Sequence, residues 1–182
     1  SKMPGDYWQQ FANTRLLHGY QYTHPGKKLN FMGHEIGQCS EWSEERGLDW
    51  VLLDFDIHQQ LQAWVRDLNH FYAANRCLWE LDYDPAGFRW IEANDADNSV
   101  FTYIRSAQDP ADFLVIALNF TPVPRYNYRI GVPEPGYYAE VLNSDSAYYG
   151  GSNLGNEGGR HTDQSGSHGF RYSLSLTLPP LA

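Results

Sequence analysis

The sequence predicts an α/β segment of helix, strand and helix, followed by an all-β antiparallel sandwich. Apolar residues recur at helical spacing in two stretches before residue 81. Beyond residue 81 they alternate in short runs that are separated by turn clusters. We therefore expect two parts, residues 1–81 and residues 82–182. A chain of 182 residues is long enough to bury a core but short for several complete domains.

Two helices are predicted in the first part, over residues 6–22 and 56–74. Each stretch places apolar side chains on one stripe. Each also starts with an acidic residue followed three positions later by glutamine, the pattern of a capping box. The two predicted capping pairs are Asp6 with Gln9 and Asp56 with Gln59.

One buried strand is predicted between the helices, over the apolar run 29–32. A lone strand leaves backbone donors and acceptors unpaired at both edges. The apolar stripes of the two helices also need a surface to cover them. We therefore expect residues 1–81 to be the closing segment of a larger α/β barrel. The long stretch 33–53 that follows the strand reads as a loop, and loops of this length are usually functional.

The second part is predicted to be a sandwich because six apolar runs alternate with turn residues. The segment 143–169 is rich in Gly, Ser and Asn, so we expect a mobile loop there. The predicted strands cover residues 88–93, 100–106, 113–120, 128–132, 137–142 and 170–178.

Composition excludes several classes of function. The net charge of −9, with 13 Lys and Arg that form no run, argues against nucleic acid as a partner. No run is apolar enough to cross a membrane, and the first residues do not resemble a signal peptide. The two cysteines, Cys39 and Cys77, favour reduced thiols in a cytoplasmic protein. The seven histidines are dispersed, so no metal and no cofactor are expected.

Two groups of motifs run along the whole chain. The first group is His24–Leu29, Phe31–Gln38, Glu41–Trp42 and Leu48–Trp50. The second group is Val65–Asn69, Glu80–Asp82, Gly87–Ile91, Asn94–Val100, Asn119–Arg125, Tyr128–Pro133, Glu140–Asp145 and Tyr149–Gly151. Together they resemble glycogen (1,4-α-glucan) branching enzymes of the α-amylase superfamily. The first group is similar to the segment that carries the last barrel strand of this family and its following loop, and the second is similar to the family in order and spacing.

The resemblance implies that residues 1–81 end a catalytic (β/α) barrel and that residues 82–182 form the C-terminal β-sandwich. It implies an enzyme of glycogen biosynthesis, a transferase that cleaves α-1,4 links and re-forms them as α-1,6 branches. The family's catalytic carboxylates lie on earlier strands, so none is carried over and the chain alone is expected to be inactive. The expected partners are α-glucan and the rest of the barrel, and we expect an N-terminal truncation.

Two other interpretations remain open. In the first interpretation, the isolated chain is a stand-alone glucan-binding or structural β-sandwich module. In the second, the helices of two copies pair, because large uncovered apolar stripes favour self-association in water.

Glu35 and Gln38 are the first candidate substrate-binding residues. They follow the predicted strand directly, at the rim where functional groups of a barrel collect. A structural hydrogen bond to a neighbouring strand loop is an equally good explanation. Trp42 and Trp50 in the same loop are candidates for stacking on sugar rings, and packing under the loop is their structural alternative.

Tyr148 and Tyr149, beside the glycine-rich segment, are candidate surface contacts for glucan. Two other tryptophans are expected in the core. Trp64 lies on the stripe of the second helix, and Trp90 occupies an alternating position of the first strand after residue 81.

Overall fold

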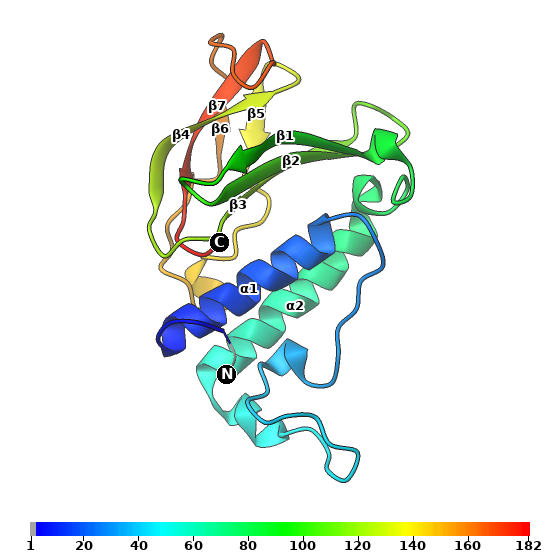
Figure 1. Cartoon of the computed structure of the whole chain (residues 1–182), viewed down its shortest axis with the longest axis vertical. Coiled ribbons are helices and arrows are strands. Elements are labelled where there is room, and N and C mark those ends of the chain that lie inside the picture. The colour runs from blue at the N-terminus through cyan, green and yellow to red at the C-terminus, as the bar shows by residue number, and fades with distance from the viewer. Residues whose placement is uncertain (1–2) are drawn as a thin grey trace.

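The structure, a computed structural model that describes residues 3–182, places two helices below a set of β-sheets (Figure 1). Helix α1 spans Tyr7–Thr23. Its capping box is confirmed: the Asp6 carboxylate accepts from the Gln9 backbone N–H at 2.8 Å, and the Asp6 N–H donates to Gln9 Oε1 at 3.0 Å. These bonds satisfy backbone donors that have no partner inside the helix.

Helix α2 spans Asp56–Ala74, as predicted, but the capping box expected at its start is wrong. The N-cap is Phe55, which has no side-chain cap, and Asp56 is already helical. Gln59 instead donates its amide to the Leu53 carbonyl at 2.7 Å. The two helices pack side by side through a buried apolar cluster formed by Phe11, Tyr22, Leu61, Trp64, Val65 and Leu68. Trp64 confirms its predicted place in the core.

The strand expected over residues 29–32 is absent, since this segment has no regular secondary structure. Leu29 is 73% exposed, and Phe31 and Met32 are also exposed. No strand of the described residues lies beside this segment, so its backbone has no ladder partner and its apolar side chains have no covering layer. The apolar run alone therefore does not make a strand here.

Three sheets form the second part of the chain. A three-stranded antiparallel sheet has the order β1-β2-β3, and two two-stranded sheets pair β4 with β7 and β5 with β6. The predicted strands are present with shifted ends, except that 100–106 is reproduced as predicted. Strand β6 was not predicted. The bounds are β1 Phe88–Asp95, β2 Val100–Ser106, β3 Phe113–Asn119, β4 Arg125–Val132, β5 Tyr137–Ala139, β6 Gly159–His161 and β7 Tyr172–Leu178.

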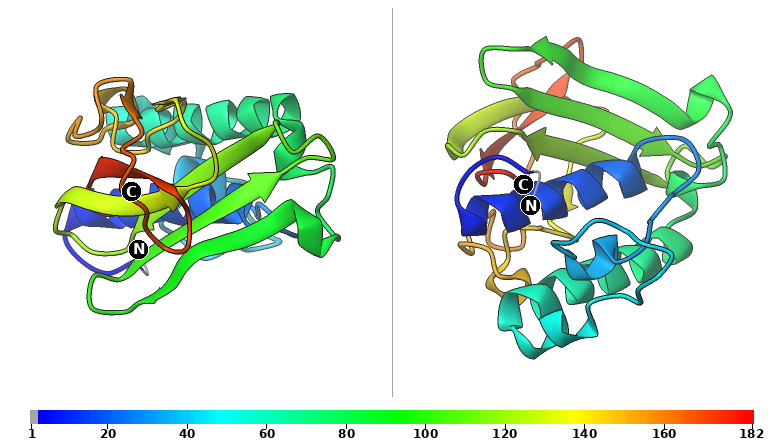
Figure 2. Two further views of the ribbon diagram at one scale, coloured as in Figure 1. Left: turned by 90° about the horizontal axis from the view of Figure 1, so that it is seen from above. Right: turned by 60° about the horizontal axis from the view of Figure 1, so that its bottom comes forward.

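The β1-β2-β3 sheet lies between α1 and the β4-β7 sheet. One of its faces packs on α1 through Leu16, Tyr103 and Leu118. Its other face brings Val115 against the cluster that includes Ile130 and Leu174 on the β4-β7 sheet. Figure 2 shows the resulting order of sheet, α1 and α2 in its right-hand view. The helices thus cover one outer face of the sandwich.

Trp90 was expected in the core and is instead 40% exposed. It lies on the α1-facing side of the sheet, next to Phe88 and Tyr103. Strand alternation gives the face of a side chain correctly, but it does not show that α1 leaves this margin of the face uncovered.

Arg105 joins the helices to the sheet. Its side chain is fully buried, and its guanidinium donates to carbonyls from three separate segments and to one carboxylate. The acceptors are the carbonyls of Gly87 (3.1 Å), Thr23 (2.7 Å) and Leu78 (3.0 Å) and the Asp82 carboxylate (3.0 Å). Such a buried cation is stable only because it is paired and its donors are hydrogen-bonded.

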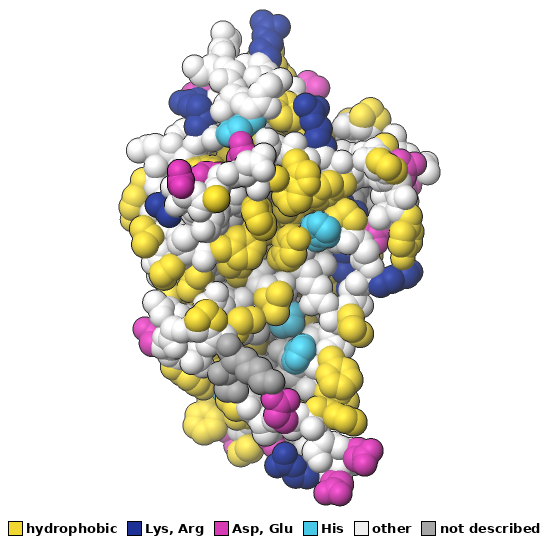
Figure 3. Space-filling view, viewed as in Figure 1, with side chains coloured by type: hydrophobic (Ala, Val, Ile, Leu, Met, Phe, Trp, Pro, Cys, Tyr) yellow, Lys and Arg dark blue, Asp and Glu magenta, His cyan; other side chains and the backbone are white. Residues whose placement is uncertain are grey.

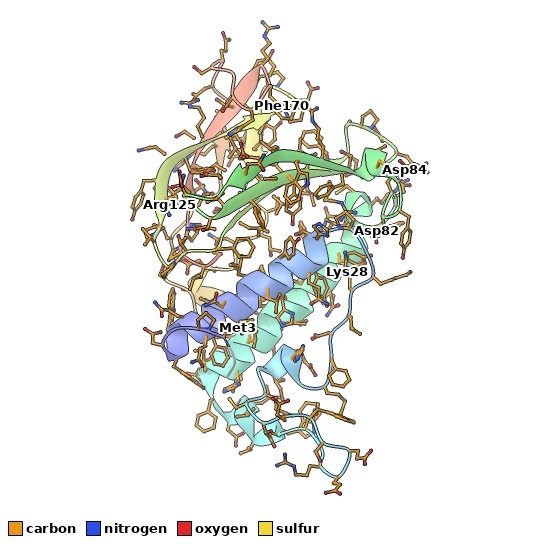
Figure 4. All side chains as sticks on the ribbon, in the orientation of Figure 1. Met3, Lys28, Asp82, Asp84, Arg125 and Phe170 are labelled. Atoms are coloured by element: carbon orange, nitrogen blue, oxygen red, sulfur yellow. The ribbon has the colours of Figure 1, made fainter. Side chains whose placement is uncertain are left out.

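Lys28 lies near Asp82 at the same junction of helices and sheet, as labelled in Figure 4. Its ammonium group donates to the His24 carbonyl at 2.5 Å and lies 5.3 Å from the centre of the Tyr72 ring. The pKa of Lys28 is lowered to about 8, mainly by burial; the Asp82 carboxylate opposes this shift, and the Arg105 charge adds to it. The junction therefore carries two cations with one neighbouring carboxylate.

The glycine-rich segment over 143–169 was expected to be a mobile loop, and the structure gives it a network of buried hydrogen bonds. Asp145 is only 1% exposed and accepts from the Ser152 N–H (2.9 Å), the Ser152 hydroxyl (2.5 Å) and the Leu154 N–H (3.1 Å). Asn156, also buried, bonds to both backbone groups of Thr177 on β7. These side chains supply the fixed contacts that apolar packing supplies elsewhere.

Candidate functional site

The loop between the helices is built around one tight turn. A 3₁₀ turn, His34–Ile36, lies between Gly33 and Gly37, whose φ angles of 83° and 63° favour glycine. The Ile36 side chain is fully buried and anchors the turn.

Two histidines from the helices hold the backbone of this turn. A ring nitrogen of His58 on α2, Nδ1, lies 2.6 Å from the Ile36 carbonyl oxygen. On α1, His18 Nε2 lies 3.4 Å from the His34 carbonyl. Burial lowers the pKa of His18, and the hydrogen bond to the His34 carbonyl opposes this shift. A neutral imidazole with one N–H fits such a carbonyl contact.

Glu35 projects from this turn and is partly buried. Its charge acts on two groups of α1, since it favours protonated His18 and raises the pKa of the Tyr22 hydroxyl, for which burial is the larger cause.

Gln38 closes the loop that follows. Its Oε1 accepts from the Asp49 N–H at 3.0 Å, and its amide donates to the Ser40 carbonyl at 3.4 Å. The Ser40 hydroxyl in turn donates to the Asp49 carboxylate. These bonds join Gln38 to two residues of its own loop and hold the loop in shape.

The two tryptophans of the loop present large exposed rings. Trp42 is 50% exposed and lies against Phe31, with the ring centres 5.9 Å apart. Trp50, on the 3₁₀ helix Trp50–Asp54, is 58% exposed. Figure 3 shows apolar side chains gathered at this end of the molecule and, separately, over the sheet above α1. Exposed rings of this kind suit either a sugar ring or a covering polypeptide.

The two adjacent tyrosines have different environments. Tyr148 is 59% exposed, and its hydroxyl accepts from Arg66 at 2.9 Å beside an open groove on α2. Tyr149 is 8% exposed, donates to the Asp67 carboxylate at 2.9 Å and packs edge-on against Trp64. Burial and the Asp67 hydrogen bond raise the pKa of Tyr149. The expectation that Tyr149 is a surface contact is therefore wrong, because its ring belongs to the core.

The candidate residues do not form one site. Glu35, Gln38 and Trp42 share the loop between the helices, whereas Tyr148 lies on the 3₁₀ turn Ala147–Tyr149 next to α2. Among residues 3–182, no three metal-ligating side chains come together, and no helix is long and apolar enough to cross a membrane.

Sequence reasoning missed the buried polar residues that support the loops. These are His18 and His58 under the turn at residues 34–36, and Arg15, whose Nε donates to the Ser144 carbonyl at 2.8 Å. Burial lowers the pKa of Arg15 to about 10, against the opposing charge of Asp145. Their only signal in the sequence is their place on the apolar stripe of a helix, where a polar residue needs a buried partner.

The fold is of the class in which two packed helices are followed by an all-β, antiparallel domain. Residues 90–182 match the family described as "Alpha amylase, C-terminal all-beta domain". The chain belongs to this family.

The whole chain is also homologous to the C-terminal region of proteins named 1,4-alpha-glucan branching enzyme GlgB. It is 54% identical over 181 residues to the protein of Paramagnetospirillum magneticum, with 100% of the chain and 24% of that relative covered. It is 56% identical over 180 residues to the protein of Thiobacillus denitrificans, covering 99% of the chain and 24% of that relative.

The protein of Aquifex aeolicus is 50% identical over 181 residues, with 100% of the chain and 29% of that relative covered. The chain therefore spans about a quarter of the length of the relatives it matches.

Proposed function

We propose that this chain is the C-terminal part of a 1,4-α-glucan branching enzyme that acts in glycogen synthesis in the cytoplasm. The observation that carries the proposal is identity of 50–56% over the whole chain, including both the helices and the β-sheets. Similarity confined to residues 90–182 would fit any member of the α-amylase C-terminal family. Similarity that also includes α1, α2 and their loop fits one kind of enzyme.

In this proposal, residues 1–81 close the catalytic barrel and residues 82–182 form the attached β domain. The exposed apolar side chains between the helices support the first half of it. Leu29, Phe31 and Met32 are exposed to water in this chain. Further elements of the barrel would cover their apolar surface, which is favourable. The segment 29–32 then gains the neighbouring strands that it lacks here.

The loop residues contact the glucan in the assembled enzyme. Glu35 and Gln38 shape the rim, while Trp42 and Trp50 offer ring faces to sugar units, and Tyr148 is a separate surface contact. Their exposure supports this role for the two tryptophans and Tyr148. For Gln38, the bonds to Asp49 and Ser40 support a role in holding the rim in shape.

A chimera tests the proposal. The matching C-terminal residues of the Aquifex aeolicus relative are replaced by this chain, and branching is followed by the loss of iodine staining of amylose. The chimera is expected to branch amylose, and the chain alone is not. Branching by the chain alone, or a folded chimera without activity, contradicts the proposal.

The alternative, a stand-alone glucan-binding module, makes a different prediction. It rests on the exposed rings of Trp42, Trp50 and Tyr148. In that case the chain alone is retarded in a native gel that contains amylose, and replacing the three rings by alanine abolishes the retardation. The chimera separates the two proposals, because a stand-alone module would not restore branching there.

A further inference from the structure

Both ring nitrogens of His58 are engaged, and their two bonds join the helices to the turn at residues 34–36. The Nδ1 atom lies 2.6 Å from the Ile36 carbonyl oxygen, and the Nε2 atom lies 3.1 Å from the Tyr7 hydroxyl oxygen. Because a carbonyl oxygen only accepts, Nδ1 carries the proton, and Nε2 of the neutral ring then accepts from the Tyr7 hydroxyl. His58 is 1% exposed, so water does not replace either bond.

The segment 33–38 is closed on itself and carries two of the candidate residues. The Gln38 N–H donates to the Gly33 carbonyl at 3.0 Å. Ile36 lies between Glu35 and Gln38 inside this closed segment. A shift of the Ile36 carbonyl therefore displaces Glu35 and Gln38 together.

The turn also lies tightly against the helices, as the right-hand view of Figure 2 shows for the short helix beside α2. A Cβ atom on Gly37 would come within 2.9 Å of the Leu61 side chain and 3.2 Å of the Phe11 ring. Packing thus sets how closely the turn approaches the helices, and the hydrogen bond from His58 sets its orientation.

Tyr7 connects this hydrogen bond to the surface of the molecule. It is the first residue of α1 and is 54% exposed. Its ring packs edge-on against Phe11 at 5.1 Å between centres, and Phe11 packs edge-on against His58 at 4.9 Å. Burial, and after it the neighbouring Cys39, raise the pKa of the Tyr7 hydroxyl, which therefore keeps its proton and donates it to His58 at neutral pH.

We propose that Tyr7 and His58 are positioning residues for the glucan. Through the Ile36 carbonyl they hold Glu35 and Gln38 in one orientation at the rim. The inference rests on the proposed function, in which these two side chains shape that rim. Neither Tyr7 nor His58 contacts the substrate. They supply a single arrangement of the rim, so that glucan binding does not have to select one among several.

Two substitutions of His58 separate this role from simple filling of space, because each retains one of the two bonding positions. The amide nitrogen of Asn matches Nδ1 in its distance along the side chain and can donate to the Ile36 carbonyl. The amide of Gln matches Nε2 and reaches toward Tyr7 instead. Filling of space predicts that the smaller Asn is the more harmful. Positioning predicts the opposite order.

Kinetics of the chimera described above give the first test. His58→Gln is expected to raise KM for amylose about tenfold, the effect of an unpaired buried carbonyl, with kcat changed less than ~twofold. His58→Asn and Tyr7→Phe each lose only the bond between Tyr7 and His58, so each should raise KM about two- to threefold. The double variant should do no more than either alone. His70→Gln, an exposed position on the same helix, is the matched control and should leave KM unchanged.

Two results of these kinetics overturn the inference and leave the proposed function intact. One is an unchanged KM in the active chimera that carries His58→Gln. The other is a greater loss with His58→Asn than with His58→Gln, because the volume of the ring is then what matters. An inactive chimera with the natural chain contradicts the proposed function instead, and the inference is then decided by the chain alone.

Hydrogen exchange tests the inference in the chain alone, without branching activity. The Gln38 amide, which closes the segment 33–38, is expected to exchange about tenfold faster in His58→Gln than in the natural chain. In His58→Asn its rate should stay within about threefold of the natural rate. Urea midpoints of the three proteins show whether global unfolding contributes. Equal protection of the Gln38 amide in all three proteins overturns the inference.

Discussion

The loop over residues 24–55 and the glycine-rich loop over 143–169 are long connections that are stabilised in opposite ways. The first is rich in apolar side chains, yet Phe31, Trp42 and Trp50 are exposed. The second is polar, yet Asp145 and Asn156 are buried and fully engaged in hydrogen bonds. A loop is thus ordered by the contacts that it makes within the chain. Its number of apolar residues shows only how much surface a partner can cover.

The largest effect is expected from Asp145→Asn. The new amide places donors against the N–H groups of Ser152 and Leu154, so the free energy of unfolding should fall by about 2–4 kcal/mol. Urea denaturation measures the change. Asp163→Asn is the matched control, because Asp163 forms an exposed ion pair with Arg129 and should cost under ~1 kcal/mol. Equal losses would show that the polar network does not hold the glycine-rich loop.

A smaller loss is expected from Asn156→Ala, which removes the side chain that joins this loop to Thr177 and Glu140. The unpaired backbone groups of Thr177 should lower the free energy of unfolding by about 2 kcal/mol. Asn94→Ala, at an exposed position, is the control and should change it by under ~0.5 kcal/mol. The same urea measurements compare the two, and a neutral Asn156→Ala would contradict the account.

The loop between the helices is expected to lose stability in mild acid through His18. Its pKa is lowered in the folded state, so below the unfolded value of about 6.5 the unfolded chain binds more protons and stability falls. Above that pH the contribution is fully present. Urea midpoints at pH 7.5 and 5.5 should therefore differ more for the natural chain than for His18→Gln. Equal differences in the two proteins would exclude His18 as the cause.

The smallest effect on stability is expected from Trp50→Ala. The ring is 58% exposed and lies outside the apolar clusters, so the free energy of unfolding should change by less than ~0.5 kcal/mol. In the chimera described above, the same substitution should raise KM for amylose. A large loss of stability in the chain alone would show that Trp50 holds the loop and would remove the contrast with the glycine-rich loop.

Local signals in the sequence predicted local structure well. The capping pair Asp6 and Gln9 marked the start of α1, and alternation gave strand β2 with its observed bounds. Where the outcome depends on a distant partner, the prediction was wrong. Residues 29–32 have the pattern of a strand but no neighbour, and Trp90 has the pattern of a core residue but an incomplete cover.

The candidate site shows the same limit. Exposed rings at Trp42, Trp50 and Tyr148 agree with the interpretation of the sequence, although their contact with glucan stays a prediction. Tyr149 was placed on the surface because its neighbours are glycine-rich, and the sequence does not reveal that Trp64 packs on it from 85 positions away. Order in the glycine-rich loop also escaped prediction, because composition does not show which carboxylate is buried.

Arg105 has a consequence for how the molecule melts. Its four acceptors come from the end of α1, from the turns before β1 and from Asp82, so no single segment can replace the water that its guanidinium gives up. In a sheet that formed without the helices, the Arg105 guanidinium would be shielded from water but would lack part of its hydrogen-bond acceptors. Helices and sheet are therefore expected to unfold in a single cooperative transition, with the same midpoint by far-ultraviolet and tryptophan signals.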